Sequence, residues 1–99
     1  MAGANYLEFD DPWYLQIKSL LQEYYGGRFN AIEQLSVDWG RFYLGIWIKA
    51  HKDKLGLLIG KNGDAVEGLE RALKSSNIHP QKKVSVDVSI VTFDLSQYK

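Results

Sequence analysis

Two glycines separated by two residues enclose a lysine and an asparagine in the segment Gly60-Lys61-Asn62-Gly63. Because glycine has no Cβ, the backbone of such a segment can approach a phosphate group closely, and the lysine adds a positive charge. A segment with helical spacing follows, and the free N–H groups and dipole at its start also favour an anion. These residues therefore suggest a turn that binds the backbone of a polyanion.

Two apolar segments must position this turn. Residues 54–59 lead into it, and we expect a short helix there with Asp53 as its N-cap. A longer helix is expected over residues 64–75, because apolar residues recur there at helical spacing, at Val66, Leu69, Ala72 and Leu73. The turn is thus predicted to join two helices.

A further helix is predicted near the start of the chain, after an N-terminal arm at residues 1–9. Asp11 is a typical N-cap and Pro12 suits the first helical position. Gly26-Gly27 would end this amphipathic helix of about 13 residues. Its apolar face is predicted to consist of Trp13, Ile17, Leu20, Leu21 and Tyr24.

Three strands are predicted from alternating apolar residues. The first covers residues 32–38, and a tight connection at 38–41 follows, with Gly40 available for a positive φ. The second strand covers residues 41–49. One of its faces would hold Phe42, Leu44, Ile46 and Ile48, and the other Tyr43, Gly45, Trp47 and Lys49. The third strand places Val84, Val86, Val88 and Ile90 on one face.

The expected fold class is α+β, with a three-stranded sheet and three helices on one of its faces. The element order α-β-β-α-α-β is that of the KH domain in its type II topology, in which a Gly-x-x-Gly loop binds the nucleic-acid backbone. This domain is expected over residues 10–91, and residues 92–99 are expected to form a C-terminal tail.

Further features favour one KH family. Asp10-Asp11 provide an acidic pair at the first helix, and Ile59-Gly60-Lys61-Asn62-Gly63 fits an Ile-Gly-basic-x-Gly turn. The segment from Glu67 to Leu73 is similar to the Glu-x-Leu-x-x-x-Leu helix that follows this turn, and valines and isoleucines alternate over 84–91. On these features, Phe9 to Val91 resembles the N-terminal KH domain of the family of small-subunit ribosomal protein three.

The resemblance implies a structural constituent of the small ribosomal subunit that binds ribosomal RNA and neighbouring ribosomal proteins. The RNA-binding residues would be the turn and basic residues around it, namely Ile59, Gly60, Lys61, Asn62, Gly63, Lys52, Lys54, Arg71, Lys74, Lys82 and Lys83. Proteins of this family are larger and basic and carry a second domain that handles messenger RNA, so that activity is not transferred. A short, neutral version suits an organellar ribosome in the mitochondrial matrix, with a cytoplasmic ribosome as the alternative.

The charge balance limits this interpretation. The chain has 12 basic and 12 acidic residues, whereas nucleic-acid-binding domains usually have a basic surface. The charges are unevenly distributed, because residues 49–99 hold nine basic and six acidic residues and residues 1–48 hold three and six. No apolar stretch reaches the ~18–20 residues of a membrane span, so no membrane association is expected.

Aromatic residues suggest a second surface. Tyr43 and Trp47 share the strand face that should point away from the helices, and Trp39 is close by in the turn. They would contact a partner protein, or the arm or the tail 92–99 would cover them. Two other functions stay open: a stand-alone chaperone or regulator that binds single-stranded RNA, and a degenerate KH domain that only binds proteins.

Other chemistry finds no support in the sequence. Gly56 and Gly60 are separated by three residues and Asn62 follows the lysine, whereas a P-loop requires four residues and then Ser or Thr. The two histidines, His51 and His79, have no ligand-type partner at a suitable spacing, and cysteine is absent. We therefore expect no enzyme, no metal and no cofactor.

Overall fold

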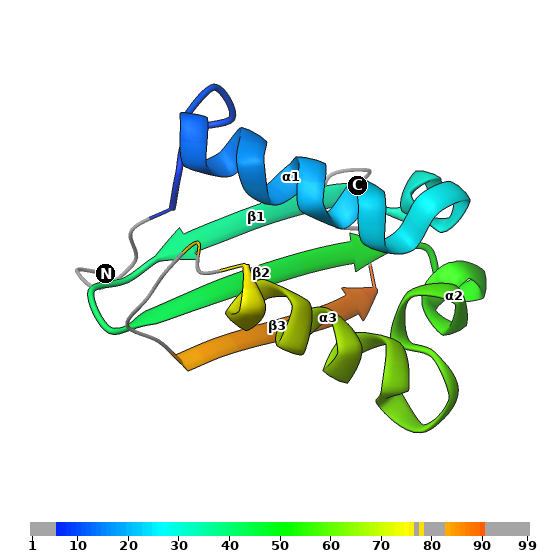
Figure 1. Ribbon diagram of the computed structural model, residues 1–99. Helices are drawn as coiled ribbons and strands as arrows, with labels where there is room; N and C mark the ends of the chain where they lie inside the picture. Colours follow the sequence, from blue (N-terminus) through cyan, green and yellow to red (C-terminus); the bar gives the residue numbers. More distant parts are fainter. Residues whose placement is uncertain (1–5, 77, 79–82, 91–99) are drawn as a thin grey trace.

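A computed structural model of the chain describes residues 6–76, 78 and 83–90. It is an α+β domain with a three-stranded mixed sheet of order β1-β2-β3 and two long helices, α1 and α3 (Figure 1). The elements are α1 (Pro12–Tyr25), β1 (Gln34–Trp39), β2 (Tyr43–Ala50), α2 (Leu55–Ile59), α3 (Asp64–Ser75) and β3 (Lys83–Ile90), with 3-10 turns at Gly26–Ala31, Lys52–Lys54 and Lys61–Gly63. Within the described part of the chain, no helix has the length and apolarity needed to cross a membrane.

Helix α1 begins and ends as the sequence predicts. The Asp11 carboxylate accepts a hydrogen bond from the Trp13 N–H at 2.8 Å, Pro12 takes the first position, and Gly26 ends the helix with a φ of 58°. The predicted apolar face was wrong in part, however. The residues that α1 buries are Tyr14, Ile17, Leu21 and Tyr25, whereas Trp13 is exposed and Leu20 and Tyr24 are half-buried.

The hydrogen bonds of two tyrosine hydroxyls explain why α1 buries a different face from the predicted one. Tyr14 donates a hydrogen bond to the Leu35 carbonyl at 3.0 Å, and Tyr25 donates one to the Leu58 carbonyl at 2.8 Å. A tyrosine can be buried when its hydroxyl finds a partner, and both partners here are backbone groups that apolar spacing does not reveal. The first bond joins α1 to β1, and the second joins α1 to α2.

The hairpin of β1 and β2 is antiparallel, and β3 runs parallel to β2. Leu44, Ile46 and Ile48 are buried under the helices as predicted, but Phe42 is 68% exposed because it precedes β2 in the turn. Gly40 does not adopt the expected positive φ. It is required for another reason, since a Cβ at Gly40 would collide with the Tyr43 ring.

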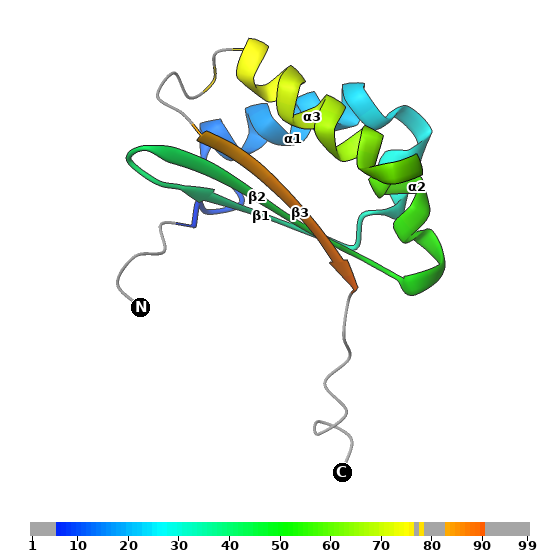
Figure 2. The ribbon, with the colours of Figure 1, turned by 90° about the horizontal axis from the view of Figure 1, so that it is seen from below.

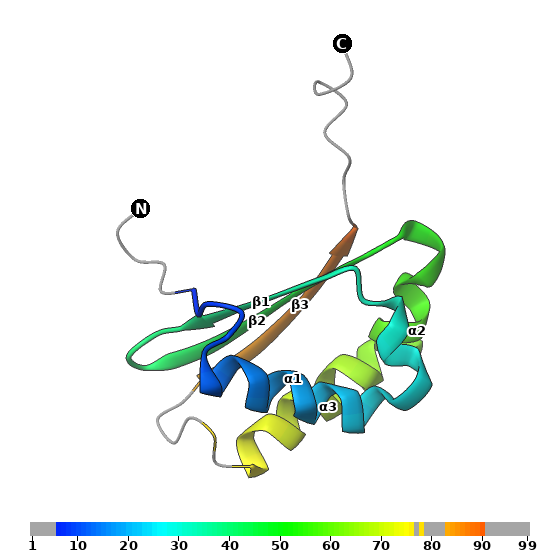
Figure 3. The same ribbon diagram turned by 90° about the horizontal axis from the view of Figure 1, so that it is seen from above.

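The helices lie on one face of the sheet, and α1 and α3 run side by side across it (Figures 2 and 3). Leu69 and Leu73 of α3 join Ile17 and Leu21 of α1 in the core between the layers. The close approach of the two helices depends on Gly68, where a Cβ would collide with the Tyr24 hydroxyl. Among the described residues, no helix or strand covers the other face of the sheet (Figure 2).

Both edge strands are partly covered. At the free edge of β3, the Glu70 carboxylate accepts a hydrogen bond from the Val86 N–H at 2.9 Å. At the free edge of β1, Tyr6 pairs with Asp38, and the Leu7 N–H donates to the Val37 carbonyl at 2.9 Å. Two residues of the predicted arm thus extend the sheet. Such contacts reduce the exposed backbone through which edge strands pair with other chains.

Candidate nucleic-acid interface

The Gly-x-x-Gly segment forms a tight corner between α2 and α3. Gly60 has φ 81° and ψ 174°, Asn62 has φ 58° and Gly63 has φ 80°. The Gly60 N–H donates to the Gly56 carbonyl at 3.0 Å, and the Gly63 N–H donates to the Gly60 carbonyl at 3.3 Å. Non-glycine residues rarely adopt a positive φ, and asparagine tolerates it best. The corner therefore has a defined shape, with the side chains of Lys61 and Asn62 exposed at its tip.

The two glycines are required for different reasons. A Cβ at Gly60 would collide with the Asp64 carboxylate and would lie 2.7 Å from the Ala65 nitrogen. The packing of the corner itself therefore excludes a side chain at Gly60. A Cβ at Gly63 would meet no atom within 4 Å, so only its φ favours glycine there. Both glycines were predicted from the sequence to let a ligand approach, but the contacts within the chain are enough to explain Gly60.

Gly56 is a residue of this region that the predicted site did not include. It lies exposed in α2, and a Cβ there would meet nothing within 4 Å. Its φ is not positive. Glycine in a helix costs about 1 kcal/mol relative to alanine, and no contact within the described residues requires it at this position. The signal in the sequence was a glycine inside a predicted helix. Because it has no side chain, Gly56 leaves backbone exposed on the surface next to the corner.

Basic side chains lie exposed near the corner. Lys52 and Lys54 occupy the 3-10 turn that precedes α2, and Lys61 occupies the tip. Within the described residues, the only contact under 4.0 Å between a basic and an acidic side chain joins His51 Nε2 and Glu33 Oε2 at 3.4 Å, so none of these lysines is paired with a carboxylate there. The prediction that Asp53 caps α2 was wrong, because the N-cap is Lys54 and no side chain caps this helix.

The structure does not bring all predicted basic residues to the corner. Arg71 and Lys74 are exposed on α3, and at a rise of 1.5 Å per residue Lys74 lies about 15 Å further along the helix from Asp64. Helix α3 carries the chain back across the sheet, so Lys83 starts β3 beside Tyr43, at the end of the sheet away from the corner (Figure 1). Lys82 lies outside the described residues. Ile59, in contrast, ends α2 directly before the corner and is half-buried.

The three predicted interface aromatics do not share one surface. Tyr43 and Trp47 are 37% and 41% exposed, on the sheet face opposite the helices. Trp39 was wrongly grouped with them, because it ends β1 on the helix side and stacks on Trp13 with ring centroids 5.1 Å apart. The Tyr43 hydroxyl donates to the buried Asp38 carboxylate at 2.8 Å, and this hydrogen bond raises the pKa of Tyr43.

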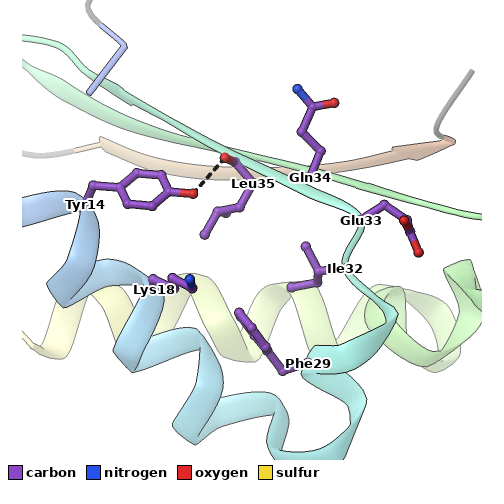
Figure 4. Close-up of a pocket in the computed structure, with 7 residues that line it drawn as sticks. All are labelled: Tyr14, Lys18, Phe29, Ile32, Glu33, Gln34 and Leu35. Carbon is purple, nitrogen blue, oxygen red and sulfur yellow. Dashed lines mark hydrogen bonds between the residues drawn. The ribbon is translucent and has the colours of Figure 1, made fainter. Parts of the chain in front are cut away.

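In the described part of the chain, two hollows border α1, and neither was predicted from the sequence. One of about 220 Å³ lies between α1 and β1, where the Tyr14 hydroxyl contacts the Leu35 carbonyl (Figure 4). Its lining residues are Tyr14, Lys18, Phe29, Ile32, Glu33, Gln34 and Leu35. The other, of about 410 Å³, lies beside the start of α3, next to the corner. Its lining residues are Tyr24, Arg28, Asp64, Ala65, Gly68 and Arg71.

Among the residues that the structure describes, no three His, Cys, Asp or Glu side chains gather as a metal site would require. The corner thus presents exposed backbone, one lysine and one asparagine, which are groups that bind phosphate or sugar. No protein-family model matches the chain, and no curated protein matches it.

Proposed function

We propose that the chain binds RNA through the corner at residues 60–63. The observation that carries this proposal is an exposed corner whose shape is fixed by internal contacts while its two outward side chains, Lys61 and Asn62, are free to contact a ligand. A preorganised backbone loses little conformational freedom on binding. The lysine supplies charge, and the asparagine can donate a hydrogen bond to a phosphate or sugar oxygen.

The surroundings of the corner support the same function. Lys52 and Lys54 are exposed and unpaired within the described residues, and the bare backbone at Gly56 lets a ligand approach α2. Asp53 and Asp64 carry the opposite charge, so the local field is only modestly positive. Binding should therefore depend on fitted contacts at the corner as well as on charge, with a modest salt dependence.

Our specific proposal is a type II KH domain in which α1, α2 and α3 are the three helices on one face of the sheet. Its role would be that of a structural protein of the small ribosomal subunit, in a mitochondrial or a cytoplasmic ribosome. Contacts to folded ribosomal RNA would depend on shape and backbone more than on base sequence. A stand-alone regulator would instead bind short single strands with some base preference.

The test reverses the charge at the tip of the corner with Lys61→Asp combined with Asn62→Asp. Aspartate tolerates the positive φ at position 62, so the free energy of unfolding should change by no more than about 0.5 kcal/mol. We expect at least a tenfold loss of RNA affinity. The control is Arg41→Asp, which reverses one exposed charge in the hairpin turn and accounts for two of the three charge units that the double variant changes. It should bind RNA as the wild type does. Equal affinity of the double variant and the control would exclude the corner.

The RNA tested should separate the two RNA-binding roles. Folded small-subunit ribosomal RNA and short random single strands can be compared in the same assay. Preference for folded RNA, with co-sedimentation of the chain and small subunits, supports the ribosomal role. Binding of short strands in light, RNase-sensitive complexes supports the regulator.

One observation favours protein binding as a second candidate function. Trp47 and Tyr43 lie exposed on a sheet face that no described element covers. Exposed aromatic residues are enriched in protein interfaces. Complexes that survive RNase treatment but are lost in Trp47→Ala would assign this function to the sheet face, provided that the variant keeps its stability.

A further inference from the structure

We infer that the 410 Å³ hollow between α1 and α3 binds a phosphate group, and that it continues the RNA path from the corner at residues 60–63. This inference rests on the proposed function for its ligand, and it assigns a role to Arg28 and Arg71. Asp64 directly follows Gly63 and lines the hollow, so the hollow begins where the corner ends. A strand that leaves the corner along the start of α3 would pass over it.

The two arginines come from different elements and line the same hollow. Arg71 lies on α3, on the same helix face as Gly68 and Asp64, at spacings of three and four residues. Arg28 lies in the 3-10 turn after α1. Within the described residues, neither guanidinium lies within 4.0 Å of a carboxylate. Arginine binds phosphate through paired N–H donors, so two guanidinium groups at one hollow, neither with a carboxylate partner among the described residues, suit this ligand.

Arg28 is already held in place. Its Nε donates to the Tyr25 carbonyl at 3.4 Å, its Nη1 donates to the Leu57 carbonyl at 3.3 Å, and its guanidinium lies 5.4 Å from the centre of the Tyr25 ring. A guanidinium has five N–H donors, so these bonds leave others for a ligand. These contacts restrict the Arg28 side chain before binding, so less side-chain entropy would be lost than for an unrestrained arginine.

The remaining lining residues narrow the ligand class. The Tyr24 hydroxyl donates its proton to the Ala65 carbonyl at 2.7 Å, so it has no second proton for a ligand. Gly68 and Ala65 offer little apolar surface, which disfavours an apolar ligand. The volume is within the range of about 300–1,000 Å³ typical of small-molecule sites. Asp64 opposes an anion, but the two arginines outweigh it by one charge.

The opposed charges give a test with two directions. We expect Arg71→Gln to weaken RNA binding several-fold and to reduce the slope of log affinity against log salt by about 0.7, the value for one single-strand phosphate contact. Asp64→Asn should strengthen RNA binding, and it should not reduce the slope of log affinity against log salt. Arg41→Gln, an exposed arginine in the hairpin turn, is the matched control and should change neither quantity. Arg71→Gln is the main variant because Arg71 makes no hydrogen bond or ion pair within the described residues that its replacement would break. Arg28→Gln removes hydrogen bonds to Tyr25 and Leu57, so it should weaken RNA binding in the same way only if the variant folds.

Titration with inorganic phosphate separates the sources of the ligand. The NMR signals of the Arg28 and Arg71 Nε–H groups should shift with phosphate alone, and both signals should shift further with RNA. Slopes for Arg71→Gln and Arg41→Gln that equal the wild-type value would overturn the inference that an RNA strand crosses the hollow. Shifts with phosphate in a chain that binds no RNA would keep the anion site and refute the proposed function. No shift with either ligand would refute the site.

Discussion

The corner at residues 60–63 and the outer face of the sheet are both exposed, but their side chains are held differently. At the corner, internal contacts fix the backbone and leave Lys61 and Asn62 free. On the sheet, the hydroxyl of Tyr43 is already bonded to Asp38, and Trp47 is the larger exposed side chain. The corner is therefore suited to a polar, charged ligand, whereas the sheet face is suited to an apolar contact through Trp47.

Within the corner and the helix before it, a glycine is not by itself evidence of a ligand site. Gly60 is explained by Asp64 and Ala65, whereas Gly56 has no explanation within the described residues. Gly56, outside the Gly-x-x-Gly segment, is thus the glycine that the contacts of the described residues leave unexplained. Substitutions at the two positions should separate structural from functional requirements.

The largest expected effect is that of Gly60→Ala. The new Cβ would collide with Asp64 and Ala65 at a φ that disfavours any side chain, so we expect a loss of about 2–4 kcal/mol in the free energy of unfolding. Gly63→Ala, which meets open space, should lose only about 1 kcal/mol. Urea denaturation measures both. Equal losses would show that internal packing does not set the shape of the corner.

The next largest effect is the pH dependence of the free energy of unfolding that is due to Tyr25, which bonds to α2 before the corner. Burial, and secondarily the neighbouring Tyr24, raises the pKa of Tyr25 to about 12, although Arg28 lowers it. The unfolded chain releases this proton near pH 10 and the folded chain does so only near pH 12, so stability is fully present below pH 10 and falls between these values. The expected fall is about 2–3 kcal/mol.

Tyr25→Phe is the control for this titration. It should abolish the part of the alkaline fall that is due to Tyr25, and it should cost about 1–2 kcal/mol at neutral pH because the Leu58 carbonyl loses its partner. Unfolding by urea at several pH values measures both effects. An identical alkaline fall in the variant would show that the titration of Tyr25 does not cause it, and an unchanged stability at neutral pH would show that Tyr25 does not support α2.

A smaller effect is expected from Gly56→Ala, and it sharpens the comparison most. Alanine should stabilise α2 by about 0.5–1 kcal/mol, because it restricts the unfolded chain and meets no atom in the folded one. The same methyl group should weaken RNA binding if the ligand approaches the backbone there. Thermal unfolding and RNA affinity are measured on the same variant. Stronger or unchanged RNA binding would exclude α2 from the interface.

Trp47→Ala on the sheet face should change stability by no more than Gly56→Ala does. Because the ring is 41% exposed and packs less than a core side chain, the loss should be within about 1 kcal/mol. RNA affinity should not change. A loss of RNA binding comparable to that of the Lys61 and Asn62 double variant would instead place the RNA on the sheet.

The sequence predicted features that depend on local chemistry. Helix α3 spans Asp64–Ser75 as expected, and Asp11 and Gly26 mark the ends of α1. Both follow from residue types at fixed spacings, which act within one or two turns. The hydrogen-bonded partners of Tyr14 and Tyr25 lie 21 and 33 residues away, and for this reason the buried face of α1 was predicted wrongly.

Of the candidate site, only the corner at residues 60–63 could be predicted from the sequence. The corner is a continuous segment, so its exposed tip could be identified from the residues alone. Lys83 was grouped with the corner because it is basic, but it lies beside Tyr43, and the length of α3 separates it from the corner. The hollow beside the corner could not be predicted, because Arg28 and Arg71 meet only through the packing of α1 against α3.

The most direct test of the account is a titration of the ¹⁵N-labelled chain with RNA, followed through its amide signals. We predict that the largest shifts occur at the amides of residues 54–64, including Gly60 and Gly63, while the Trp47 indole signal stays in place. Shifts confined to β2, β3 and the Trp47 indole, with the amides of the corner unchanged, would contradict the claim that the corner is the RNA-binding element.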